Sequence, residues 1–130
     1  MKIEINKLVS DKIGFKFLEK FAKRVLKLIK LDIPELSVAV VDDKKMIALN
    51  KQYKKHNYTT DVLAFDYGEI IICLDQAKRQ AKELKHSLKE ELEILLIHGI
   101  LHLSGYDDET KKDFNKMIKK QREVWGKIKS

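Results

Sequence analysis

Residues 98–108 read HGILHLSGYDD, and the rest of the chain is organised around this stretch. His98 and His102 are four residues apart, so in a helix both imidazoles leave the same face one turn apart. Gly105 is expected to end that helix, because glycine adopts the positive φ that reverses a chain. Asp108 follows the reversal, six residues beyond His102. The spacing therefore predicts a metal site with three ligands, His98, His102 and Asp108.

The segment around the two histidines is apolar on almost every side, which is typical of a buried helix. Its apolar residues are Leu92, Ile94, Leu95, Leu96, Ile97, Ile100, Leu101 and Leu103. Buried imidazoles need partners, and one divalent metal serves both. Three protein ligands leave a coordination position for water, which favours a catalytic metal. The alternatives are histidines that are hydrogen-bonded within the core, and an Asp107 or Asp108 that caps the next helix.

The pattern follows the metzincin zinc signature, but one residue is missing and one is replaced. In H-E-x-x-H proteases the glutamate after the first histidine is the general base. Gly99 stands in that place, and glycine cannot move a proton. The sequence thus predicts a metal site without the protease base.

The remaining patterns predict one α+β (α/β layered) domain over residues 1–130, in the order β-α-β-α-β-β-α-α-α. Strands are expected at 2–6, 37–41, 62–65 and 69–73, and helices from Ser10 or Asp11 to about Leu31, from Asp42 or Asp43 to about Tyr53, from Asp75, from Ser87 and from about Glu109. About four strands would form a small mixed sheet covered by about five helices. The last two strands should form a hairpin, and the β-α-β pairs should be parallel with right-handed crossovers.

Several side chains are expected to face the core from these helices. They include Met46, Leu49, Asn50 and Tyr53, then Ala77, Ala81 and Leu84, and finally Phe114, Met117, Ile118, Trp125 and Ile128. Ser87 and Glu90 have the spacing of a capping box at the start of the histidine-bearing helix.

The chain has 130 residues, of which 44% are hydrophobic and 36% charged, and a net charge of +7. Residues 1–30 carry nine basic residues against three acidic ones. This balance favours a polyanion partner, nucleic acid first, or simply lysines that solvate the outer sides of helices. The single Cys73 indicates a reducing cytoplasm. Neither an apolar signal region nor a run long enough for a membrane span is expected.

The stretch 98–107, HG-x-LHL-x-GYD, resembles the signature of the YbeY family of bacterial metal-dependent endoribonucleases. A second family stretch, an asparagine, a tyrosine-arginine pair and then TDVLSF, is similar to Asn50, Tyr53-Lys54 and residues 60–65. Residues 68–70 resemble the family's Gly-Asp-Ile hairpin. In this chain Asp108 stands where the family has a third histidine, and Lys54 where it has an arginine.

The resemblance implies cleavage of single-stranded RNA, maturation of ribosomal RNA including the 3′ end of the small-subunit RNA, and ribosome quality control, with the ribosome or its proteins as partners. It implies a Zn²⁺ ion and catalytic roles for His98, His102 and Lys54. The His₂Asp set also resembles the facial triad of non-haem iron, so another divalent transition metal would fit. Lys54 keeps the positive charge of arginine but loses its two-pronged grip on phosphate.

The expected reaction is metal-assisted phosphodiester cleavage with Lys54 beside the phosphate. No residue is an obvious general base. Either metal-bound hydroxide suffices as the nucleophile, or the RNA supplies its own 2′-hydroxyl. Lys55 and His56 would hold the RNA backbone or lie in a solvated loop, and Asp61 would orient a ligand or cap a turn. The rival functions are a metallopeptidase, a ribosome-associated RNA-binding protein with a structural metal, and an iron-dependent oxygenase.

Overall fold

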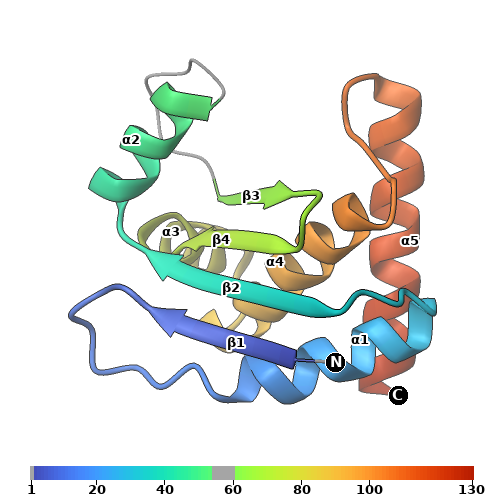
Figure 1. Ribbon diagram of the computed structural model, residues 1–130, viewed down its shortest axis with the longest axis horizontal. Coiled ribbons are helices and arrows are strands. Elements are labelled where there is room, and N and C mark those ends of the chain that lie inside the picture. The colour runs from blue at the N-terminus through green and yellow to red at the C-terminus, as the bar shows by residue number, and fades with distance from the viewer. Residues whose placement is uncertain (1, 54–60) are drawn as a thin grey trace.

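A mixed four-stranded sheet with helices on both faces forms the centre of the protein, seen in a computed structural model that describes residues 2–53 and 61–130 (Figure 1). The elements are β1 (Lys2–Lys7), α1 (Phe17–Ile29), β2 (Glu35–Val41), α2 (Asp43–Tyr53), β3 (Val62–Phe65), β4 (Glu69–Cys73), α3 (Leu74–Leu84), α4 (Leu88–Leu103) and α5 (Lys111–Lys129). This arrangement confirms the predicted α+β class and the predicted order of elements.

The strands lie in the order β1-β2-β4-β3. β1, β2 and β4 are mutually parallel, and β3 is antiparallel to β4, which confirms the predicted hairpin. The prediction that the second β-α-β pair is parallel is wrong. The tight turn at Gly68, with φ +102°, requires β3 and β4 to be antiparallel. Because β4 takes the place beside β2, β3 becomes an edge strand.

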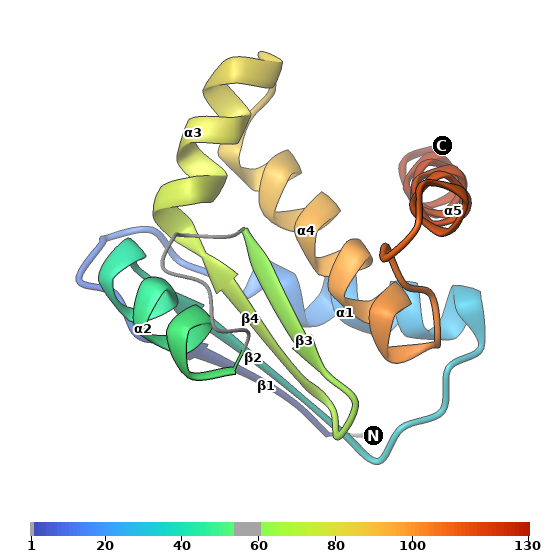
Figure 2. The same ribbon diagram turned by 90° about the horizontal axis from the view of Figure 1, so that it is seen from above.

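Alternation along the strands produces two apolar layers, one on each face of the sheet. α1 and α4 lie against one face and α5 packs on their outer side, whereas α2 covers the other face (Figure 2). The first layer receives Val38, Val40, Ile70 and Ile72 from the sheet, and the second receives Ala39, Val41, Leu63, Ile71 and Cys73. α4 is therefore enclosed by the sheet, α1, α3 and α5, which explains why it is apolar nearly all round.

Helix α1 begins at Phe17, later than predicted. The expected caps serve other contacts. Asp11 accepts a hydrogen bond from the backbone N–H of Ile13 and forms an ion pair with Lys78 of α3. Gly14 comes next after Ile13 and disfavours a helix in this segment before Phe17. At the other end of the chain, α5 is capped by Thr110, whose hydroxyl accepts from the Asp113 N–H at 3.0 Å.

Three side chains expected in the core are exposed instead. Tyr53 lies edge-to-face on Phe65, with ring centroids 5.2 Å apart. Leu84 is 61% exposed and Phe114 is 45% exposed. Both line a groove between α3 and α5 instead of entering the core.

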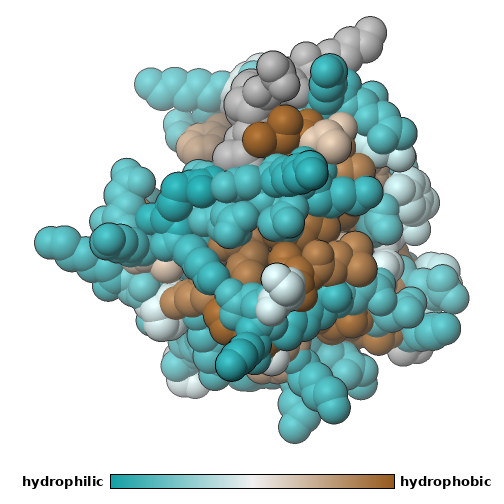
Figure 3. All heavy atoms as spheres, turned by 90° about the vertical axis from the view of Figure 1, so that its left-hand side faces the viewer, coloured by the Kyte–Doolittle hydropathy of each residue, from teal (hydrophilic) through white to brown (hydrophobic). Residues whose placement is uncertain are grey.

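Charged and polar side chains cover most of the side of the molecule drawn in Figure 3, around an apolar area near its middle. This surface agrees with a composition in which 36% of residues are charged. Within residues 2–53 and 61–130, no helix combines the length and the apolar character needed to cross a bilayer.

Candidate metal centre

The end of α4 reverses the chain as the sequence predicts. Gly105 has φ +108°, and its N–H donates to the His102 carbonyl at 3.1 Å. The Tyr106 N–H reaches back to the Leu101 carbonyl at 3.1 Å. These bonds satisfy carbonyls at the end of the helix. The reversal carries Asp108 back over the last turns of α4.

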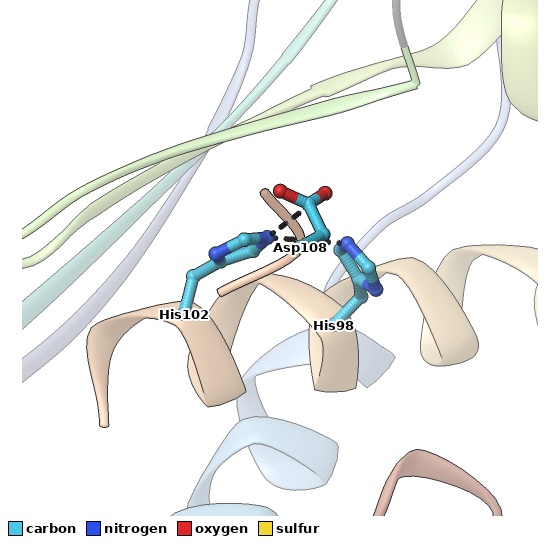
Figure 4. A group of neighbouring side chains, drawn as sticks. All are labelled: His98, His102 and Asp108. Carbon is cyan, nitrogen blue, oxygen red and sulfur yellow. Dashed lines mark hydrogen bonds and ion pairs between the residues drawn. The ribbon is translucent and has the colours of Figure 1, made fainter. Parts of the chain in front are cut away.

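His98, His102 and Asp108 point toward a common centre (Figure 4). The two imidazole Nε2 atoms are 3.3 Å apart, and His102 Nε2 lies 3.8 Å from Asp108 Oδ2. One potential ligand atom from each residue lies within 4.8 Å of the others. The His102 and Asp108 side chains are 26% and 48% exposed, so the group is accessible from solvent.

The spacing of these atoms fits a single metal ion. Two nitrogens bonded to tetrahedral zinc at about 2.0–2.1 Å are about 3.3–3.4 Å from each other, and the two imidazole nitrogens are 3.3 Å apart. The alternative role of Asp108 as a helix cap is filled by Thr110. Asp107 accepts a long bond of 3.3 Å from the Glu109 N–H. The geometry thus supports the three-ligand prediction.

Gln121 of α5 is part of this centre, although the sequence argument missed it. Its Oε1 lies 2.9 Å from His98 Nδ1. When Nδ1–H donates to this oxygen, the lone pair of His98 resides on Nε2, the atom that faces His102. Gln121 lies on the inner side of α5 between the buried residues Met117 and Val124. A polar residue on a buried stripe is the signal that would have revealed it.

Gly99 packs closely against the sheet. A Cβ atom at this position would lie 2.9 Å from Cγ2 of Ile70, which is fully buried in β4. A glutamate in this place would therefore collide with the core. The helix that carries His98 and His102 can approach the sheet because position 99 has no side chain.

Three residues of the predicted phosphate-binding loop, Lys54, Lys55 and His56, lie outside the described residues. Asp61 is described. It is half-buried before β3, its carbonyl accepts from the Cys73 N–H at 2.9 Å, and it shares a groove with His98.

Comparisons with known proteins identify the family of this chain. The family model described as Endoribonuclease YbeY matches residues 4–129. A protein named Endoribonuclease YbeY from Aquifex aeolicus is 43% identical over 84% of this chain and 76% of its own length. Another from Persephonella marina is 35% identical over 99% of this chain and 94% of its own length.

The fold has a counterpart among solved structures. The solution structure of TM1509 from Thermotoga maritima has a TM-score of 0.64 and 31% sequence identity, covering 99% of this chain and 92% of that one. A family model that spans nearly the whole chain, relatives above 30% identity and a shared fold agree with one another. The chain therefore belongs to the YbeY endoribonuclease family.

Proposed function

We propose that this chain is a metal-dependent endoribonuclease that cleaves single-stranded RNA. Its expected role is ribosomal RNA processing, including the 3′ end of the small-subunit RNA, and ribosome quality control in the cytoplasm, with residues 1–130 as one catalytic domain. The observation that carries the proposal is the convergence of two Nε2 atoms at 3.3 Å beside Asp108. It occurs in a chain whose relatives are named Endoribonuclease YbeY.

His98, His102 and Asp108 would hold the metal, with Zn²⁺ as the first candidate. A bound ion of this kind polarises a phosphoryl oxygen and lowers the pKa of coordinated water toward about 7. Gln121 orients His98 through Nδ1. The partial exposure of His102 and Asp108 leaves room for a phosphodiester. A carboxylate in place of the third histidine suits several divalent metals, so another divalent transition metal is the alternative to Zn²⁺.

Lys54 is proposed to sit beside the scissile phosphate and to balance the charge that develops on its oxygens. This role depends on its position in the family stretch, directly after Tyr53. Gly99 offers no proton acceptor, so activation of the nucleophile would depend on the chemistry that a bound ion supplies. The nucleophile would be water or the 2′-hydroxyl of the RNA itself.

The charge of the chain suits an RNA substrate. The net charge is +7, and a row of exposed lysines follows the outer side of α1. These residues are Lys16, Lys20, Lys23, Lys27 and Lys30. Such a surface would bind phosphates of the RNA or the ribosome, and its contribution should weaken as salt rises.

The decisive experiment compares wild-type protein with His102→Ala, both purified without chelators. Metal content, thermal stability and cleavage of single-stranded RNA, double-stranded RNA and casein are measured in parallel. We expect the wild type to contain about one divalent metal per chain and to cleave only single-stranded RNA. His102→Ala should stay folded but lose metal and at least about 10³-fold in cleavage rate, because the metal-binding group is incomplete.

Two results would contradict the proposal. Normal RNA cleavage by a folded, metal-free His102→Ala protein would exclude a catalytic metal at this group. Casein hydrolysis without RNA cleavage would favour the hypothesis that the protein is a metallopeptidase. A structural metal would be recognised differently, since its removal by chelator would lower the melting temperature of the wild type.

A further inference from the structure

A groove lined by residues of α3, α4 and α5 reaches His98 of α4. Its volume is about 380 Å³, near the lower limit of ligand pockets, which suits one heterocyclic ring system rather than a large ligand. His98 belongs both to the groove and to the metal-binding group. Its Nε2 faces the metal-binding group, while its Nδ1 side, bonded to Gln121, forms the end of the groove.

The walls of the groove are apolar and partly aromatic. Phe114 and Trp125 come from α5, and Leu84 comes from α3. Phe114 and Leu84 are 45% and 61% exposed, so the fold does not use these faces for its own core. Arg122 lies on the same side. Phe114 offers an exposed ring and Trp125 a half-buried one. Aromatic rings beside a guanidinium are groups on which single-stranded nucleic acids stack their bases.

The floor of the groove carries a buried carboxylate. Glu91 is only 2% exposed. Its Oε1 lies 2.5 Å from His86 Nε2, and its Oε2 accepts from Gln80 Nε2 at 2.7 Å. A carboxylate oxygen retains a second lone pair after one hydrogen bond. Asp61 adds a second carboxylate to the lining, and two carboxylates complement an amino group rather than a carbonyl.

We propose that this groove binds one unpaired nucleobase carrying an exocyclic amino group, adjacent to the phosphate at the metal-binding group. The inference rests on the proposed function for the identity of the ligand. Its basis is the continuity of the groove with the metal-binding group through His98, the aromatic walls and the acceptor-rich floor. Such a subsite would select unpaired RNA, because a base must leave its helix to enter.

Trp125 allows a direct test, because it is the only tryptophan in the sequence and it lines the groove. Adenosine is titrated into metal-loaded wild-type protein while tryptophan fluorescence is followed. We expect saturable quenching in the millimolar range, typical of one stacked base. Inosine, which has a carbonyl in place of the amino group, should bind at least about threefold more weakly, and ribose 5-phosphate should cause no change.

The variant Phe114→Ala should weaken adenosine binding about fivefold or more, and Leu84→Ala should weaken it to a smaller extent. Tyr67→Ala is the matched control, because Tyr67 is an aromatic residue that is 71% exposed but lies outside the groove. This variant should bind adenosine like the wild type.

Several outcomes would overturn the inference. They are the absence of quenching by adenosine, equal quenching by ribose 5-phosphate, equal affinities for adenosine and inosine, or unchanged binding in Phe114→Ala. A groove that binds a protein segment would give the first of these. Because no cleavage is measured, an RNA-cleaving protein that ignores adenosine would refute the subsite alone. Conversely, adenosine binding by a protein that cannot cleave RNA would refute the proposed function alone.

Discussion

The two ends of α4 each place a histidine beside a carboxylate, but they use the pair differently. At the N-terminal end, His86 Nε2 lies 2.5 Å from the buried Glu91, and Gln80 binds the other carboxylate oxygen. At the C-terminal end, His102 and Asp108 are 3.8 Å apart and partly exposed, and a second imidazole nitrogen converges on them.

The difference shows how one helix separates stability from function. The buried Glu91 carboxylate has both His86 and Gln80 as partners, so the protein itself satisfies it. At the C-terminal end two imidazole nitrogens and a carboxylate oxygen converge instead, and these are atoms that bind metal ions, at the spacing of metal ligands. We therefore expect changes at the first end to alter folding, and changes at the second end to alter ligand binding.

The largest effect should come from Asp108→Ala. The loss of one of three proposed ligands should lower zinc affinity at least about 100-fold, a change larger than that typical of residues that only hydrogen-bond to a metal ligand. The stability of the metal-free protein should stay the same, because the Asp108 side chain is half exposed. Zinc titration against a competing chelator measures the affinity, and urea unfolding of the apo protein measures the stability.

Asp107→Ala is the control for this prediction, since Asp107 is the neighbouring exposed carboxylate and its bond to the Glu109 N–H is long, at 3.3 Å. Its zinc affinity should match that of the wild type. Equal affinities in the two variants would show that Asp108 is not a ligand.

His86→Ala tests the other end of the helix. Without the imidazole, the buried Glu91 keeps its hydrogen bond from Gln80 but loses its contact with His86, and an incompletely paired buried charge is costly. The free energy of unfolding should fall by about 2 kcal/mol, less than for a fully buried pair because the His86 side chain is 22% exposed. Urea denaturation gives this value, and metal content should not change. If the variant were as stable as the wild type but lost metal, His86 would contribute to metal binding rather than to folding.

Much of this organisation could be predicted from the sequence, because it depends on local patterns. The spacing of His98 and His102, the reversal at Gly105 and the capping box at Ser87 all depend on residues within one or two helical turns. The order of elements was correct for the same reason. The proposed ligand role of Asp108 remains a prediction that the geometry supports.

Features that depend on distant partners could not be predicted in this way. Gln121 approaches His98 across 23 residues, and its role becomes visible only when α5 packs on α4. The apolar spacing of Leu84 and Phe114 cannot distinguish a core from the wall of a groove. Likewise, the position of β3 at the sheet edge depends on the pairing of β2 with β4, which are far apart in the sequence.

Gly99 lies within α4 between its two ends, and Gly99→Ala should have a smaller effect on the free energy of unfolding than His86→Ala. The new Cβ would lie 2.9 Å from Cγ2 of Ile70, so the helix or the strand must shift. Overpacking costs about 1–3 kcal/mol and alanine regains up to about 1 kcal/mol of helix propensity, so we expect a net loss of about 1 kcal/mol. Chemical denaturation measures it.

Gly126→Ala is the matched control, because Gly126 is also helical and a Cβ there would have no neighbour within 4 Å. This variant should be more stable than the wild type by roughly 0.5–1 kcal/mol. If both glycine variants were stabilised, the close approach of α4 to Ile70 would not restrict position 99.

The smallest effect concerns the capping box that begins α4, next to His86. The Ser87 hydroxyl accepts from the Glu90 N–H at 3.1 Å, and Glu90 Oε1 accepts from the Ser87 N–H at 3.2 Å. Hydrogen bonds from the Ser87 backbone and then from its hydroxyl lower the pKa of Glu90 in the folded protein. A carboxylate with a lowered pKa stabilises the fold above its ordinary pKa of about 4.3, and this contribution is lost as the pH falls through the folded value.

Ser87→Ala removes the hydroxyl and should cost about 0.5 kcal/mol at neutral pH, near the low end for exposed caps. Glu90→Gln should instead flatten the dependence of stability on pH below about 5, since an amide does not titrate. Urea unfolding at several pH values separates the two effects. Because the box lies at the N-terminal end of α4, neither substitution should alter zinc affinity, whereas a change in affinity would show that the two ends of the helix are coupled.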